Sequence, residues 1–188
     1  MARLGAVLLL PLLALLAAPP ARACTLDDVD GSLSRDTLNH YFPDALSVLA
    51  RVVEMRRAGG LPPSPGLTPT PLHIRSLMGL ASRLDKQWRA AAGETPTPPI
   101  AVLLIESMLW ARLPALPSTS AADLHAQGPA DGDLVIITSE DVVRQIVAGK
   151  LVLAEAQAQG LVRLYGPQAR QSELVARLAK VGRVPKSP

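Results

Sequence analysis

Apolar residues recur at helical spacing in two segments of the N-terminal part of the chain. The first predicted helix covers residues 34–58, and Pro43 either bends it or moves its start to about residue 43. The second covers residues 72–92. The connector between them, residues 61–71, is rich in proline and therefore stiff and extended. Two amphipathic helices joined in this way predict a helical hairpin.

The pattern changes after a second proline cluster. Residues 100–113 form a dense apolar run, which fits one buried strand, two strands around Glu106 and Ser107, or a short helix. Residues 114–132 are typical of a loop. Residues 133–138 (DLVIIT) predict a strand, because β-branched side chains dominate them.

Short helices and one more strand are expected after this strand. Thr138 and Asp141 match a capping box, so a helix begins there and ends at Gly149. The later predicted elements are a helix over 150–159 closed by Gly160, a strand over 161–165 and a helix over 168–180.

The order of these elements predicts an α+β fold rather than a strict β-α-β alternation. In this arrangement an N-terminal helical hairpin accompanies a small mixed sheet that is covered by helices. We divide the chain into a helical region, 34–95, and an α+β region, 96–182, followed by a flexible tail, 183–188.

The N-terminus has the three-part layout of a secretory signal peptide. Arg3 precedes an apolar run of about 15 residues, which is shorter than the ~20 that span a bilayer, and an A-x-A pattern ends at Ala23. We expect residues 1–23 to be cleaved and residues 24–33 to form a flexible mature N-terminus. The protein is then periplasmic or secreted.

Cys24 is the single cysteine of the chain, so it cannot form an internal disulfide. Its place at the expected first mature position allows a lipoprotein, although Ala21 and Arg22 depart from the usual lipid-attachment pattern. The alternative is a soluble protein with a free or intermolecularly paired thiol.

Charge argues against nucleic acid as a partner. Arg3 and Arg22 leave with the leader, so 19 basic residues become 17 against 16 acidic ones and the mature net charge is +1. Aromatic residues make up only 3% of the chain, which disfavours stacking on bases or sugars. No later apolar run is long enough to span a membrane, so we expect none in the mature chain.

Residues 133–166, together with the helix through Lys180, resemble the second half of a sterol-carrier-protein-2-like (SCP2-like) domain. The likeness lies in the layout of the segment: a strand ending in Thr, Ser and an acidic pair, a helix ending in Gly149 and Lys150, a short helix ending in Gly160, a strand, a glycine turn and a terminal helix. The resemblance implies a sheet packed under helices, with an apolar cavity that takes a lipid, an acyl chain or another greasy ligand.

Candidate catalytic groups are sparse. The histidines, His40, His73 and His125, are far apart in the sequence and lack the spacing of a helical metal pair, so we interpret them as surface or capping residues. Ser139 has no G-x-S-x-G context and fits helix capping. We therefore expect no enzyme, no cofactor and no metal.

Glu106 is the most unusual ionisable residue, since it interrupts an apolar run. If buried, it would have a raised pKa and could serve as a polar anchor for a ligand. The favoured alternative places Glu106 and Ser107 in the exposed turn of a hairpin.

These patterns predict an exported, non-catalytic protein that binds an apolar or lipid-like ligand between sheet and helices. The alternative function is a periplasmic accessory protein for an enzyme or membrane assembly, which would dock through the arginine-rich outer faces of the two N-terminal helices. The residues expected to line the cavity are Met78, Trp88, Leu104, Met108, Trp110, Ile136, Ile146 and Leu164.

Overall fold

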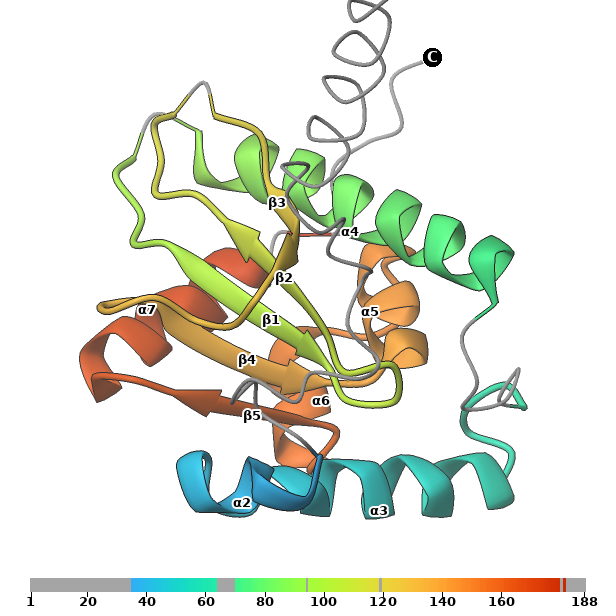
Figure 1. Ribbon diagram of the computed structural model, residues 1–188. Helices are drawn as coiled ribbons and strands as arrows, with labels where there is room; N and C mark the ends of the chain where they lie inside the picture. The colour runs from blue at the N-terminus through green and yellow to red at the C-terminus, as the bar shows by residue number, and fades with distance from the viewer. Residues whose placement is uncertain (1–34, 64–69, 94, 119, 180, 182–188) are drawn as a thin grey trace, which may run out of the picture.

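The computed structural model describes residues 35–63, 70–93, 95–118, 120–179 and 181. This part of the chain forms an α+β fold, with six α-helices and a five-stranded mixed sheet in the order β3-β2-β1-β4-β5 (Figure 1). The prediction of an α+β fold with a mixed sheet under helices is confirmed.

Helices and strands follow the apolar patterns of the sequence closely. The helices are η1 (Arg35–Thr37, a 3-10 turn), α2 (Leu38–Tyr41), α3 (Ala45–Arg57), α4 (Pro71–Ala92), α5 (Glu140–Val147), α6 (Leu153–Ala158) and α7 (Gln168–Leu178). The strands are β1 (Ile100–Leu104), β2 (Leu109–Leu113), β3 (Asp123–Ala126), β4 (Leu134–Thr138) and β5 (Val162–Tyr165). The break between α2 and α3 falls at Pro43, as proline predicts.

The centre of the sheet is the parallel pair β1 and β4. Leu104 is aligned with Thr138, so both strands end at the same edge of the sheet. The other pairings are antiparallel, and β2 follows β1 through a tight turn at residues 105–108. Every residue of β1 and β4 is buried, which explains why their sequences are continuous apolar runs.

The two faces of the sheet carry different helices. On one face, Trp110 is aligned with Leu103, and its ring centroid lies 6.0 Å from that of Phe42, which precedes α3. Tyr165 on β5 also contacts Phe42, at 5.1 Å between ring centroids. Helix α3 packs along β4 and β5. These contacts place α2 and α3 on this face.

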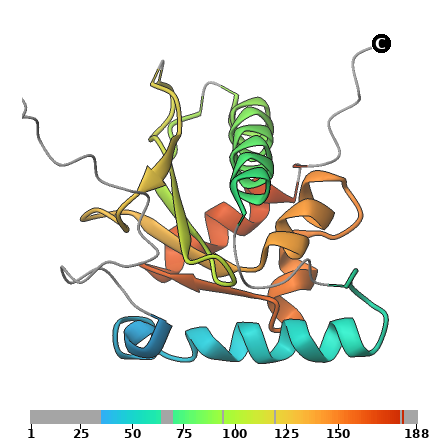
Figure 2. The ribbon, with the colours of Figure 1, turned by 45° about the vertical axis from the view of Figure 1, so that its right-hand side comes forward.

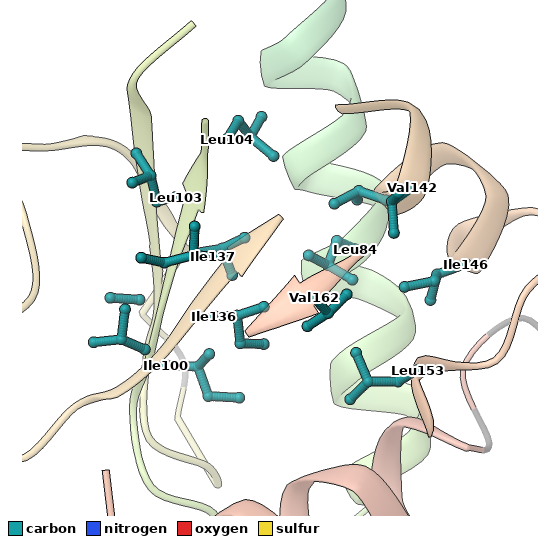
Figure 3. Close-up of a cluster of buried hydrophobic side chains, with 14 of the residues drawn as sticks. Leu84, Ile100, Leu103, Leu104, Ile136, Ile137, Val142, Ile146, Leu153 and Val162 are labelled. Carbon is teal, nitrogen blue, oxygen red and sulfur yellow. The ribbon is translucent and has the colours of Figure 1, made fainter. Parts of the chain in front are cut away.

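The opposite face of the sheet is covered by α4, α5, α6 and α7. Leu104, Ile136 and Val162 point from the strands towards these helices (Figure 3). Helix α4 packs against α5 and α7, and α6 packs against β5 and α7. The predicted hairpin of the two N-terminal helices is therefore wrong, because α3 and α4 lie on different sides of the sheet (Figure 2).

Two local predictions need correction. Strand β3 lies inside the predicted loop 114–132, where its alternating burial gives little apolar signal. The cap of α5 is Ser139, whose hydroxyl accepts a hydrogen bond from the backbone N–H of Val142 at 3.2 Å. Thr138 cannot cap the helix, because it completes β4 and its hydroxyl donates to the carbonyl of Leu161 at 3.0 Å.

The expected signal peptide, Cys24, the mature N-terminus 24–33 and the tail 183–188 lie outside the described residues. Among the helices that the structure describes, none is long and apolar enough to cross a membrane.

Candidate functional site

The structure distributes the eight expected lining residues over two faces of the sheet and a turn. Leu104, Ile136, Ile146 and Trp88 are buried, and the first three lie between the sheet and α5. Leu164 is aligned with Ile136 and is half-buried on the same face.

The remaining three expected lining residues lie apart from this group. Trp110 is buried on the opposite face, against Phe42. Met108 is half-buried in the β1–β2 turn, where its φ of 54° places it in the left-handed region. Met78 is half-buried on α4. The structure thus brings together only part of the predicted lining.

Aliphatic side chains fill the space between the sheet and the helices. We call this space, with its side chains, the apolar layer (Figure 3). The helices contribute Leu84 of α4, Val142 and Ile146 of α5, and Leu153 of α6. The strands contribute Ile100, Leu104, Ile136 and Val162.

Helix α4 adds buried polar atoms that have no hydrogen-bond partner in the described part of the chain. Within the described residues, five buried side-chain nitrogen or oxygen atoms make no hydrogen bond, and three of them belong to Asp85, Gln87 and Trp88. Trp88 follows Leu84 by one helical turn on the buried side of α4, and only 1% of its surface is exposed. Its indole N–H is therefore a buried donor, and a buried polar group without a hydrogen bond is costly.

Glu106 is both buried and in a turn. It occupies the β1–β2 turn, as the favoured interpretation predicts, but it is only 5% exposed, so the turn is not exposed there. One carboxylate oxygen accepts from Nη2 of Arg56 at 2.5 Å, and the other accepts from the backbone N–H of Glu140 at 3.0 Å. Both oxygens therefore have partners within the protein.

A buried network of charged side chains surrounds Glu106. Arg56, at the end of α3, also contacts Asp141 of α5 at 2.5 Å. Arg35 donates to the carbonyl oxygens of Ile105 and Glu106, at 3.2 and 2.6 Å. The network joins η1, α3, the β1–β2 turn and the start of α5.

The pair formed by His73 and Glu140 extends the network to α4. Nε2 of His73 lies 3.1 Å from a carboxylate oxygen of Glu140, which begins α5. Desolvation by burial raises the pKa of the Glu140 carboxyl. His73 and a hydrogen bond from Ser107 oppose the rise, whereas the neighbouring carboxylate of Glu106 adds to it.

The topology explains why these residues meet. The parallel strands β1 and β4 end at one edge, which brings Glu106 next to Glu140 and Asp141. Helix α3 reaches this edge from one face with Arg56, and α4 begins there on the other face with His73. The charged network borders the apolar layer, because Glu106 lies two residues after Leu104 and Asp141 directly precedes Val142.

Sequence reasoning missed most of this network. His73 is half-buried and pairs with Glu140, while His40 and His125 are exposed as expected. Arg56, Glu140 and Asp141 gave no signal because their partners are distant in the sequence. Ser139 serves as a helix cap, as expected. In the part of the chain that the structure describes, no group of three or more His, Cys, Asp or Glu side chains could hold a metal ion.

The fold and this site define an α+β protein with a buried charged network at one edge of its sheet. No family model matches the chain, and no curated protein matches it. Among solved structures, it is similar to a conserved hypothetical protein, possibly a sterol carrier protein, from Thermus thermophilus. The similarity covers 64% of this chain and 91% of the other, at 18% identity and a TM-score of 0.33. At this TM-score the likeness assigns neither a family nor a ligand.

Proposed function

We propose that this protein binds an apolar, lipid-like molecule without catalysing a reaction. The ligand would lie between the sheet and helices α4–α6, within the apolar layer. The supporting observation is the indole N–H of Trp88, one helical turn after Leu84 on α4, which is buried and has no hydrogen-bond partner among the residues that the structure describes. A greasy molecule with one hydrogen-bond acceptor would satisfy this donor.

The energetics favour such a ligand over a polar one. Burial of apolar surface contributes about 25 cal/mol per Å² before the costs of association are subtracted. The hydrocarbon part of a ligand would gain this free energy when it is buried in the layer. A polar ligand would instead lose its bound water, and Leu84 and Ile136 offer no hydrogen bonds in return. Side chains of the layer must move to admit the ligand.

Ligand uptake can be measured directly on the purified protein. Native mass spectrometry should show a bound lipid-like mass, and delipidated protein should take up a fluorescent fatty acid. A chain that never carries lipid and takes up no fatty acid would contradict the proposal.

The role of the indole is tested with Trp88→Phe, which removes the N–H and keeps an aromatic ring. Loss of one hydrogen bond of about 1 kcal/mol should weaken fatty-acid binding about fivefold. Binding of a pure hydrocarbon probe should change little. Trp110→Phe is the matched control, because Trp110 lies on the opposite face of the sheet and should leave both affinities unchanged.

We also propose that the protein is exported, with cleavage after Ala23. Cys24 then either carries a lipid or keeps a free or intermolecularly paired thiol. The apolar run after Arg3 supports this proposal. N-terminal sequencing and intact mass of the protein from the cell envelope or the medium would test it. Recovery of the uncleaved chain from the cytoplasm alone would contradict it.

A further inference from the structure

We infer that the outer face of α4 binds an anionic lipid surface. This basic face consists of Leu72, Arg75, Arg83 and Lys86, all of which are exposed. The inference rests on the proposed function, because a membrane is a natural source and destination for a lipid-like ligand.

The charges of the basic face are not neutralised within the described structure. Arg75, Arg83 and Lys86 form no ion pair with another described residue, in contrast to the acidic residues of α3, α4 and α5. Those acidic residues are all paired, as Glu54–Arg51, Asp85–Arg89, Glu140–His73 and Asp141–Arg56. The exposed charged side chains of α4 that lie outside these pairs are therefore all positive.

Helical geometry gathers these cations on one side. At about 100° per residue, Arg75, Arg83 and Lys86 lie within an arc of about 80°, and Leu72 lies in the same arc. At about 1.5 Å per residue, Arg75 and Lys86 are about 16 Å apart along the axis. A flat surface can contact all four side chains at once.

The face also offers an apolar side chain. Leu72, at the start of α4, is 76% exposed. Clustered Lys and Arg side chains are attracted to the negative surface of anionic lipids, and an exposed apolar side chain beside them can enter the interface. The opposite side of α4 carries Leu84 and Trp88, so docking through the basic face would place the apolar layer one helix away from the lipid.

The test compares sedimentation of the full chain with two kinds of vesicle, phosphatidylcholine alone and phosphatidylcholine mixed with phosphatidylglycerol. Binding to neutral vesicles measures the contribution of apolar segments, including the predicted leader. The increase in binding when the anionic lipid is added, which we call the increment, measures the contribution of the cations. We expect this increment to be large at low salt and to shrink as ionic strength rises.

The variant that removes Arg75, Arg83 and Lys86 together by substitution with Gln should lose most of the increment. Each cation near an anionic surface contributes about fivefold in affinity, so three contribute on the order of a hundredfold. The matched control removes the same charge elsewhere, as Arg51→Gln, Arg163→Gln and Arg170→Gln, and should keep the increment to within a few-fold. Circular dichroism should show both triple variants folded.

Three outcomes would overturn the inference. In the first, the unmodified chain binds mixed vesicles no more tightly than neutral ones. In the second, the control variant loses as much of the increment as the α4 variant does. In the third, soluble polyglutamate binds the basic face as tightly as vesicles do, which would indicate an acidic protein partner instead. Fatty-acid uptake, measured without vesicles, reports the proposed function separately. Retained uptake with no vesicle binding would overturn this inference alone.

Discussion

Arg56 and Glu106 form a buried ion pair, with Nη2 of the arginine 2.5 Å from the carboxylate, that ties the end of α3 to the β1–β2 turn. The guanidinium also holds Asp141, so one cation serves two carboxylates. Glu106 in turn accepts the backbone N–H of Glu140 at the start of α5. This relationship fixes α3 and α5, which lie on different faces of the sheet, to the same edge.

Removal of Glu106 should therefore destabilise the protein. Glu106→Ala leaves Arg56 with one partner fewer and the N–H of Glu140 with none, which should cost about 3 kcal/mol in the free energy of unfolding. Urea denaturation measures this change. The control is Glu54→Ala, whose pair with Arg51 is exposed, with side-chain exposures of 62% and 44%. It should cost less than about 1 kcal/mol, and equal losses for the two variants would refute the special role of Glu106.

Glu140 should make stability fall as the pH rises through the acidic range. Burial raises the pKa of its carboxyl in the folded state, so the folded protein binds this proton more tightly than the unfolded chain does. Stability from this group is full below the unfolded pKa of about 4.3, and it declines above that value until the raised folded pKa is passed.

The neutral substitution Glu140→Gln removes this titration. Its stability relative to the unmodified protein should therefore increase as the pH rises from about 4.3, in urea denaturation at a series of pH values. Asp85→Asn is a control, because Asp85 pairs with Arg89 on α4, outside the network. If the difference in the free energy of unfolding between Glu140→Gln and the unmodified protein does not change with pH, the raised pKa of Glu140 is contradicted.

The cap of α5 gives a third prediction. Ser139→Ala removes the acceptor for the N–H of Val142 and should cost about 1 kcal/mol in the free energy of unfolding, as measured by thermal or urea denaturation. Ser82→Ala is the control, since Ser82 is exposed in the middle of α4 and alanine favours a helix, so its effect should be near zero or stabilising. An equal loss in both variants would mean that Ser139 does not act as a cap.

Most of the fold could be predicted from the sequence because its elements have strong local signals. The apolar run 100–113 folds as two strands around Glu106, and Gly149 and Gly160 follow α5 and α6 with positive φ angles of 70° and 74°. The helical hairpin was a wrong prediction, because a short connector specifies nearness along the chain and not the face of the sheet on which each helix packs. The face on which each helix packs depends on the sheet between the helices, and the apolar pattern of a single segment carries no information about that sheet.

The charged network could not be predicted for a different reason. Arg56 and Asp141 are 85 residues apart in the sequence. A cation near the C-terminal end of a helix is already explained by its interaction with the helix dipole, so Arg56 alone does not indicate a buried partner. Only the parallel alignment of β1 with β4 brings their ends together. Glu106 was singled out because it interrupts an apolar run, and that signal pointed to the centre of the network.

The glycine turn after β5 supports a final prediction, because Gly166 is needed for two reasons. Its φ is 127°, and a Cβ atom there would lie 2.7 Å from Cδ2 of Leu134 and 3.8 Å from its Cα. The side chain of Leu134 is fully buried at the start of β4 and has little room to move. Gly166→Ala should therefore cost about 2–3 kcal/mol in the free energy of unfolding, from backbone strain together with overpacking.

Gly132 provides a matched control for this substitution. Its φ of 84° is also positive, but a Cβ atom there would meet no described atom within 4 Å. Gly132→Ala therefore has the strain without the collision and should cost about 1 kcal/mol. Urea denaturation of both variants separates the two contributions. If Gly132→Ala is as destabilising as Gly166→Ala, then the close approach to Leu134 contributes nothing, and the turn is held by backbone conformation alone.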